Sequence, residues 1–335
     1  MNKEFRYYQR ECEEGVYEEL HNNNKCLVKM FCGTGKSLLM RKCKIIDDKK
    51  LVVFVFPTLS LIDQYYNEYF DEDKSNVLRI SSEIESTTEP DVINSFLSLD
   101  INKFICVTYQ SFNTLLDNLD GMKINVCIFD EAHHTVGETY QKLIFENDIC
   151  EKQIFFTATP KNANGIVMYE RGIENDGMCG KLVYDYPYLK GVNEGYLNPF
   201  EIRIDMYTEN NNKSIYECIA RAVLESKNNR VLTFHSDVHT ERGTSVHNFV
   251  NEIKFREVFL ELQEREYPNQ KYKKITMIGL SADMSIKKRG ELLKKFDKSK
   301  INEVVIISSC ETIGEGINMK NANMCVCLLT QNHLM

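Results

Sequence analysis

The chain has 335 residues, a formal net charge of −8 at pH 7 and a sequence pI of about 5.5. Its hydrophobic content of 43% is ordinary for a folded protein, and its length is typical of about two domains. No apolar run approaches the ~20 residues that a membrane span needs, and the N-terminus lacks the apolar stretch of a signal peptide. We therefore predict no membrane partner. A uniformly basic surface is excluded, but a local basic cleft is not.

The twelve cysteines include no Cys-x-x-Cys pair. Several lie in apolar runs, among them Cys26, Cys106 and Cys127, where a free thiol behaves as a small buried hydrophobe. We predict free thiols in a reducing intracellular compartment, in preference to disulfides or metal ligands.

An aromatic and polar segment, residues 5–10, opens the chain and precedes a helical pattern over residues 12–20. An aromatic ring can stack on a purine, and a Gln amide can pair with both a donor and an acceptor on its edge. The alternative is that the aromatic residues only pack this helix against the core.

Residues 30–37, Met-Phe-Cys-Gly-Thr-Gly-Lys-Ser, lie between a short apolar run and a helical pattern. Glycines let backbone N–H groups turn toward an anion, Lys36 would reach the β- and γ-phosphates, and the Ser37 hydroxyl would hold Mg²⁺. The full phosphate-loop pattern has a glycine where this chain has Met30, so the alternative is a turn followed by a helix start. The candidate phosphate-binding residues are Gly33, Thr34, Gly35, Lys36 and Ser37.

Apolar runs alternate with helical patterns after this loop. The predicted strands are residues 51–56, 77–81, 103–109, 125–129 and 153–157. The predicted helices are residues 59–70, 91–99, 111–119 and 139–146. Near-continuous β-branched and aromatic runs indicate strands that are buried on both faces of a parallel sheet. The pattern predicts a doubly wound α/β fold, in which ligands bind at the carboxyl ends of the strands.

Polar residues follow two of these strands. Asp130 and Glu131 come directly after strand 125–129, where one carboxylate can hold Mg²⁺ and the other can polarise water. A surface Asp-Glu at a strand end is also common without any function. Thr157 ends the next strand and Thr159 lies just after it, where hydroxyls could relay the nucleotide state, although alone they indicate only a strand-to-turn transition.

The second half repeats the α/β alternation after a mixed region. Residues 189–196 predict a short helix with a glycine stop, residues 193–199 a hinge, and residues 184–188 a packed aromatic cluster in preference to a base-stacking surface. The predicted strands are residues 201–207, 230–235, 274–280, 304–308 and 324–329. The predicted helices are residues 213–226, 247–265 (with an interruption) and 286–296. Two basic clusters, residues 271–274 and 287–289, are either solvated faces or phosphate contacts.

The ordered motifs resemble those of the superfamily 2 helicases of the DEAD/DEAH-box kind. The resemblance rests on Tyr8-Gln9, residues 33–37, Asp130-Glu131-Ala132-His133 and Thr157-Ala158-Thr159, with motif Ia over residues 56–64, motif Ib over 107–111, motif IV over 231–236 and motif V over 307–318. The loop and the Thr-Ala-Thr-Pro sequence are closest to restriction-enzyme-like motors and to helicases of large DNA viruses. A viral origin would imply the host cytoplasm.

The resemblance implies a role for each matching residue. The implied catalytic residues are Lys36, Asp130 and Glu131. The implied nucleotide-binding residues are Arg6, Tyr8, Gln9, Gly33, Thr34, Gly35, Lys36, Ser37, Gly314 and Glu315. The implied Mg²⁺ ligands are Ser37 and Asp130. The implied coupling residues are His133, Thr157 and Thr159. The implied nucleic-acid contacts are Thr58, Thr108, Ser236 and Thr312.

The same resemblance implies an α/β protein with two tandem RecA-like domains, residues 1–195 and 196–335, each a mostly parallel sheet covered by helices. No arginine follows Arg289, so motif VI is absent from the sequence, and we expect a fragment whose second domain is incomplete rather than a complete chain with impaired hydrolysis. The implied function is an ATP- and Mg²⁺-dependent helicase or translocase on single-stranded or duplex nucleic acid, with DNA favoured over RNA. One alternative is an ATP-regulated nucleic-acid-binding scaffold for a protein partner such as a nuclease or a transcription complex. Another is a P-loop kinase of a small molecule.

Overall fold

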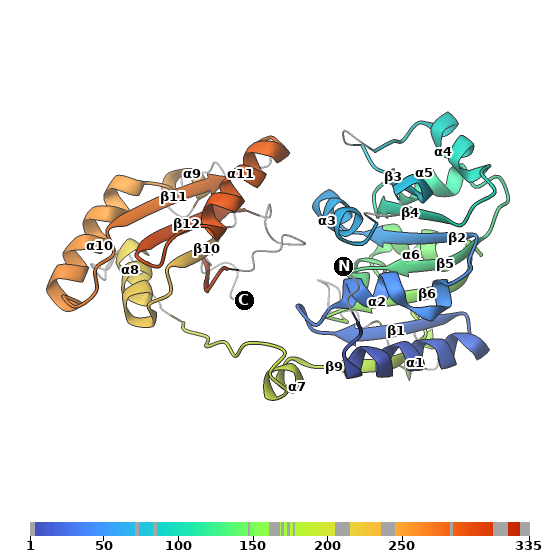
Figure 1. The fold of residues 1–335 in the computed structure, drawn as a ribbon, viewed down its shortest axis with the longest axis horizontal. Coiled ribbons are helices and arrows are strands. Elements are labelled where there is room, and N and C mark those ends of the chain that lie inside the picture. Colours follow the sequence, from blue (N-terminus) through green and yellow to red (C-terminus); the bar gives the residue numbers. More distant parts are fainter. Residues whose placement is uncertain are drawn as a thin grey trace. The chain divides into compact units, whose positions relative to one another are not determined.

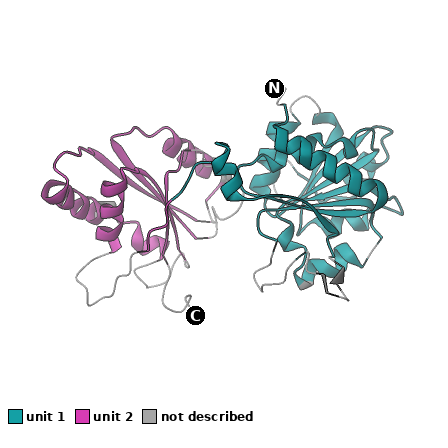
Figure 2. Cartoon of the chain, turned by 90° about the horizontal axis from the view of Figure 1, so that it is seen from below, with its two compact units in different colours: residues 1–200 teal, residues 201–335 magenta. Residues whose placement is uncertain are grey.

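The structure is a computed structural model that describes residues 4–70, 74–82, 86–146, 148–160, 168, 171–172, 175–176, 178–204, 215–235, 245–281, 284–310 and 321–328. The chain divides into two compact units, residues 1–200 and residues 201–335 (Figure 2). The domain boundary predicted after residue 195 falls inside unit 1. No helix among the described residues is long and apolar enough to cross a bilayer.

Unit 1 contains a seven-stranded sheet in the order β3-β4-β2-β5-β6-β1-β9 (Figure 1). Every neighbouring pair in this sheet is parallel. The strands are β1 (Lys25–Met30), β2 (Leu51–Phe56), β3 (Val77–Ile80), β4 (Lys103–Thr108), β5 (Ile124–Phe129), β6 (Cys150–Thr157) and β9 (Lys181–Tyr186). A short antiparallel pair, β7 (Arg171–Gly172) and β8 (Asn175–Asp176), lies outside this sheet.

Helices cover both faces of the sheet of unit 1 (Figure 1). They are α1 (Tyr7–Asn22), α2 (Lys36–Lys42), α3 (Leu59–Tyr69), α4 (Pro90–Leu97), α5 (Phe112–Asp117), α6 (Glu138–Phe145) and α7 (Tyr188–Asn193), with short 3₁₀ turns η1 (Lys44–Ile46), η2 (Lys74–Asn76) and η3 (Ala132–His134). The apolar sides of α1, α2 and α3 pack on one face, and those of α4, α5 and α6 pack on the other. All six residues of β2 are buried, as expected for a central parallel strand.

The last strand of unit 1, β9, is absent from the sequence prediction, which treated this region as a packed aromatic cluster. β9 pairs with β1 at the edge of the sheet, and its register shifts between Leu27 and Val28. The shift leaves Val183 as an extra residue, so Val183, Tyr184 and Tyr186 all pack on the α1 face. The bulge breaks the alternation that would have indicated a strand. The aromatic cluster is nevertheless present, because Tyr186 is fully buried and stacks on Tyr8 with centroids 4.2 Å apart.

Unit 2 contains a parallel four-stranded sheet in the order β11-β12-β10-β13. Its elements are α8 (Ile215–Ser226), β10 (Arg230–Phe234), α9 (Val246–Phe249), α10 (Glu252–Glu266), β11 (Lys274–Leu280), α11 (Ile286–Asp297), β12 (Glu303–Ser309) and β13 (Met324–Cys327). Helices α8, α9 and α10 pack on one face and α11 on the other. The α/β prediction is therefore confirmed in both units, and so is the interruption of the helix predicted over residues 247–265.

The strand predicted over residues 201–207 is wrong over its first part. Residues 201–204 adopt no regular secondary structure, and residues 205–207 lie outside the described part of the chain. Their alternating pattern resembles a strand, but Ile202 and Ile204 are 78% and 83% exposed. No described strand pairs with them, and an alternating pattern forms a strand only where a partner supplies hydrogen bonds.

Candidate nucleotide-binding site

The phosphate loop connects the end of β1 to the start of α2. Gly33 and Gly35 have φ angles of +81° and +87°, a left-handed conformation that glycine adopts without steric cost. Gly35 is the residue that directly precedes α2. The Thr34 hydroxyl donates a hydrogen bond of 2.6 Å to the Phe31 carbonyl. The loop is therefore held in one turn that exposes backbone at its glycines.

The start of α1 braces this loop. The Tyr8 hydroxyl donates to the Thr34 carbonyl at 2.8 Å, and the Gln9 amide donates to the carbonyls of Thr34 and Gly35 at 3.3 and 3.2 Å. Gln9 Oε1 in turn accepts a hydrogen bond from the Arg6 backbone N–H at 2.9 Å. Five predicted site residues thus lie together, and in this structure the Gln9 amide nitrogen donates to the loop itself.

Lys36 at the start of α2 and Glu131 after the end of β5 come together at the candidate site. Lys36 Nζ lies 3.2 Å from Glu131 Oε1. Lys36 is only 9% exposed; its burial works to lower its pKa, but the charges of Glu131 and Asp130 outweigh burial and raise it. The ammonium therefore stays protonated at the rim of the sheet. Ser37 follows in the first turn of α2 and is half-buried.

Asp130 directly follows β5 and is 5% exposed. Burial raises the pKa of its carboxyl group to about 6, against the opposing charge of Lys36. Its Oδ1 accepts a hydrogen bond of 3.0 Å from the Glu131 backbone N–H. Glu131 has a φ of +45°, which is costly for a residue with a side chain and typical of functional sites. A buried carboxylate beside a strained one is a suitable arrangement for binding a cation.

The predicted coupling residues lie next to Glu131. His133 Nδ1 is 3.6 Å from Glu131 Oε2 and 3.3 Å from Thr157 Oγ1. The Thr157 hydroxyl donates to the Thr159 carbonyl at 3.0 Å and accepts from the Thr159 N–H at 3.1 Å. The ends of β5 and β6 are therefore connected through His133.

Of the predicted nucleic-acid contacts, only Thr58 and Thr108 lie among the described residues. Thr58 and Thr108 lie at the carboxyl ends of the neighbouring strands β2 and β4. The Thr58 hydroxyl oxygen is buried and has no hydrogen-bond partner among the described residues, whereas the Thr108 hydroxyl accepts from the Ser111 N–H at 3.2 Å. The predicted site residues Ser236, Thr312, Gly314 and Glu315 lie outside the described residues.

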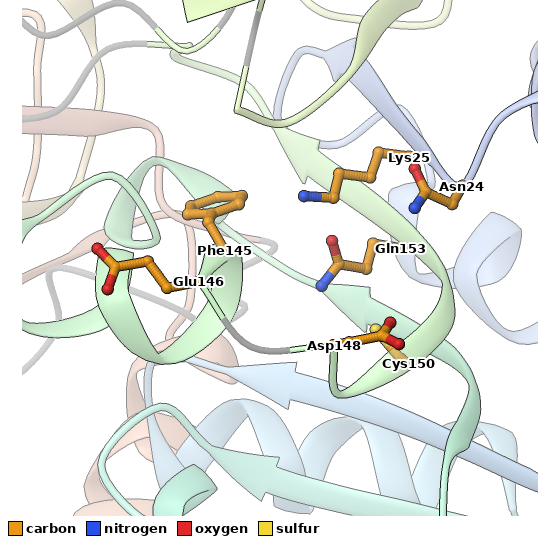
Figure 3. Close-up of a pocket in the computed structure, with 7 residues that line it drawn as sticks. All are labelled: Asn24, Lys25, Phe145, Glu146, Asp148, Cys150 and Gln153. Atoms are coloured by element: carbon orange, nitrogen blue, oxygen red, sulfur yellow. The ribbon is translucent and has the colours of Figure 1, made fainter.

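A cavity of about 250 Å³ lies elsewhere in unit 1 (Figure 3). It is lined by Asn24, Lys25, Phe145, Glu146, Asp148, Cys150 and Gln153. These residues lie around the amino ends of β1 and β6, whereas the phosphate loop follows the carboxyl end of β1. Lys25 Nζ lies 5.2 Å from the centre of the Phe145 ring. This cavity contains none of the residues that the motifs predicted.

Two residues at the candidate site were missed in the sequence. Tyr109 is buried, and its hydroxyl donates to the Asp130 carbonyl at 2.9 Å. In the sequence it lies within motif Ib and at the end of a predicted strand, but neither signal assigns a partner to its hydroxyl. Tyr196 lies with its ring centre 4.7 Å from the Arg6 guanidinium carbon, and its distance from Arg6 in the chain gives no local signal.

Comparisons with known proteins match both units. Residues 2–162 match the family model of the res subunit of type III restriction enzymes, and residues 216–333 match that of the helicase conserved C-terminal domain. The probable helicase A859L of African swine fever virus (isolate Pig/Kenya/KEN-50/1950) is 27% identical over 222 residues, which are 60% of this chain and 24% of that protein. Its counterpart from strain Badajoz 1971 Vero-adapted is 28% identical over 222 residues, with the same coverage. The chain thus spans about a quarter of the length of these relatives.

The fold is shared with a solved structure, the ATP-dependent type ISP restriction-modification enzyme LlaBIII bound to DNA. The TM-score is 0.72 at 17% identity, with 97% of this chain and 26% of that chain covered. This likeness confirms the prediction of two RecA-like units. The two family models and the viral relatives support a superfamily 2 helicase that is related to restriction-enzyme motors and viral helicases.

Proposed function

We propose that the chain is an ATP-driven motor that moves along or unwinds nucleic acid, with ATP and Mg²⁺ bound where the carboxyl ends of β1 and β5 meet the phosphate loop. The observation that carries this proposal is the convergence of Lys36, Glu131 and Asp130. The first two are 95 positions apart in the chain, yet their charged groups lie 3.2 Å apart.

The residues at this rim fit a magnesium triphosphate. Gly33 and Gly35 present backbone without side chains, so phosphate oxygens can approach their N–H groups. Lys36 supplies the cation for the β- and γ-phosphates. Ser37 and Asp130 supply the oxygen ligands that Mg²⁺ prefers. When bound, the metal neutralises the negative charge that develops during phosphoryl transfer.

The ion pair between Lys36 and Glu131 suggests how the site changes on nucleotide binding. Lys36 exchanges Glu131 for phosphate oxygens, which leaves the Glu131 carboxylate available to orient water and accept its proton. Gln9 and Arg6 lie beside the loop and form the base side of the site, while Tyr8 supports the loop through its hydrogen bond to the Thr34 carbonyl.

Nucleic acid binds at the same end of the strands in this proposal. Thr58 and Thr108 contact its backbone, and His133, Thr157 and Thr159 connect that surface to Glu131. Contacts with phosphates position a strand without reading its sequence, so we expect affinity that falls with salt and little sequence preference. DNA is favoured over RNA because the structurally similar restriction-modification enzyme is bound to DNA.

A steady-state ATPase assay with and without single-stranded DNA or RNA tests the proposal. DNA should stimulate turnover in the wild type, and Lys36→Ala and Glu131→Gln should each abolish it. Glu131→Gln should still bind ATP, since only the proton acceptor is lost. The control is Lys29→Ala, because Lys29 also lies on the chain just before the loop but pairs with Asp185 at 2.9 Å.

The same assay separates the alternatives. Tight binding of ATP and DNA without turnover in the wild type would overturn the motor and favour the scaffold. ATP turnover that neither DNA nor RNA changes, but that increases when a small molecule with a hydroxyl group is added as phosphate acceptor, would favour the kinase.

A further inference from the structure

The turn after α7 fixes the position of Tyr196. The Gly195 N–H donates to the Val192 carbonyl at 3.0 Å, and the Tyr196 and Leu197 N–H groups donate to the Gly191 carbonyl at 2.9 and 3.0 Å. Gly195 has a φ of +75°. A left-handed glycine with this hydrogen-bond pattern is a Schellman motif, which ends a helix and sets the direction of the next residues. The glycine stop thus turns Tyr196 and Leu197 back onto unit 1.

Tyr196 lies against the predicted base-binding residues at the start of α1. Its ring centre is 4.7 Å from the Arg6 guanidinium carbon and 5.1 Å from the centre of the Tyr8 ring, in an edge-on arrangement. Arg6 also donates to the Tyr8 hydroxyl at 2.9 Å, and that hydroxyl donates to the Thr34 carbonyl. A continuous set of contacts therefore runs from Tyr196 through Arg6 and Tyr8 to the phosphate loop.

Two neighbouring contacts hold the same segment in place. A Cβ atom on Gly33 would stand 3.3 Å from Leu197 Cδ2, so the segment after α7 packs directly on the phosphate loop. The Tyr186 hydroxyl donates to Glu194 at 2.6 Å, and the Tyr186 ring stacks on Tyr8. Tyr196 therefore has a defined place beside the site, although it is far from the site residues in the chain.

We propose that Tyr196 is a positioning residue for binding of the nucleotide base: it holds the Arg6 guanidinium flat, so that Arg6 forms a stacking platform for the purine ring of the nucleotide. A planar guanidinium can stack on rings, and Arg6 is exposed to solvent. Without Tyr196, Arg6 keeps its charge but loses the surface that orients it. This inference rests on the proposed nucleotide site.

The test is a comparison of two ligands, ATP and inorganic tripolyphosphate, by calorimetric titration of the full chain. Tyr196→Ala should weaken ATP binding about 3- to 10-fold and leave tripolyphosphate binding within about twofold, since only ATP has a base. Tyr196→Phe keeps the ring and should bind ATP like the wild type. Tyr17→Ala is the matched control, because Tyr17 is a 49% exposed tyrosine on α1.

A double-variant cycle separates positioning of Arg6 from a general structural role. Arg6→Ala should weaken ATP binding as Tyr196→Ala does, and the double variant should bind no more weakly than Arg6→Ala alone. Additive losses, an equal loss for both ligands, or unchanged ATP binding in Tyr196→Ala would each overturn the inference. A wild type that binds neither ligand, or binds ATP equally well after Lys36→Ala, would instead overturn the proposed function.

Discussion

The Tyr109 hydroxyl donates a hydrogen bond of 2.9 Å to the main-chain carbonyl of Asp130. Tyr109 directly follows β4 and Asp130 directly follows β5, and these two strands flank β2 in the sheet. The bond therefore crosses the end of β2 and joins two strand ends that are not neighbours. One of these ends includes Thr108, a proposed nucleic-acid contact, and the other supplies a proposed Mg²⁺ ligand.

Replacing Tyr109 with Phe should weaken this connection while keeping the ring in the core. The change leaves a buried carbonyl without its donor, so we expect a loss of about 1–2 kcal/mol in the free energy of unfolding. DNA-stimulated turnover should fall about 3- to 10-fold, with the affinity for ATP within about twofold. Denaturant unfolding and ATPase assays measure these effects.

The control for this variant is Tyr65→Phe. Tyr65 is also buried, but its hydroxyl has no hydrogen-bond partner in the part of the chain that the structure describes, so its removal should be neutral or stabilising. Equal losses of turnover in both variants would show that the Tyr109 hydrogen bond has no special role.

Gly35→Ala should damage the phosphate loop more than a glycine substitution elsewhere. A Cβ at position 35 would lie 2.4 Å from Gln9 Nε2, so the brace from α1 would have to move. The control is Gly121→Ala, since Gly121 has a φ of +81° and open space around its Cβ position. Both variants should lose about 1–2 kcal/mol of stability from the left-handed backbone.

Only Gly35→Ala should lose ATP affinity, by at least about tenfold. Titration of both variants with ATP measures the change in affinity, and their thermal unfolding measures the change in stability. A comparable loss of affinity in Gly121→Ala would mean that reduced stability, and not the clash with Gln9, explains the effect.

The sequence predicts the central strands of unit 1 well because their periodicity is local. In β2, residues 51–56 are continuously apolar, and the predicted bounds match the structure. The edge strand β9 was not predicted, because the extra residue Val183 disrupts the alternation of its side chains between the two faces of the sheet. The opposite error occurred at residues 201–204, which alternate as a strand does but have no partner among the described strands.

The candidate site also contains residues that the sequence predicts and residues that it does not. Lys36, Asp130 and Glu131 are predictable because each follows a strand whose carboxyl end must face the same edge of a parallel sheet. Tyr196 is not predictable in this way, because its contact with Arg6 depends on how α1 and α7 are positioned in the fold, and no short sequence motif encodes that. The bracing role of Gln9 was also missed, since a Gln amide offers the same groups to a base and to a carbonyl.

The buried carboxyl group of Asp130 should make the stability of the nucleotide-free protein depend on pH. Its pKa in the folded state is about 6, above the ordinary value of 3.8, because burial disfavours the charged form. A raised pKa means that the folded protein binds the proton more tightly than the unfolded chain. This stabilisation is therefore fully present below about pH 4 and is lost as the pH rises through 6.

Asp130→Asn removes this titration and should be more stable than the wild type at pH 8, by on the order of 1–3 kcal/mol. The difference should shrink as the pH falls from 7 to 5, where the wild-type carboxyl group becomes neutral. Thermal unfolding in the presence of a chelator measures it. A difference that stays constant over this range would assign the effect to packing instead of charge.

Thr157→Val should separate ATP turnover from its stimulation by nucleic acid. Thr157 is fully buried, and its hydroxyl contacts His133 and both main-chain groups of Thr159. Valine keeps the shape of the side chain but removes every one of these contacts. Because Lys36 and Glu131 are untouched, we expect turnover without DNA to stay within about threefold and DNA-stimulated turnover to fall about tenfold.

His133→Ala should give the same pattern, and the double variant should be no worse than either single variant if both residues act through one contact. Thr139→Val on α6 is the matched control, since Thr139 is exposed. ATPase rates of these variants, measured with and without a single-stranded DNA, test whether Thr157 and His133 couple nucleic-acid binding to turnover. Equal losses of unstimulated and stimulated turnover in Thr157→Val would place Thr157 in the chemical step itself and contradict a coupling role.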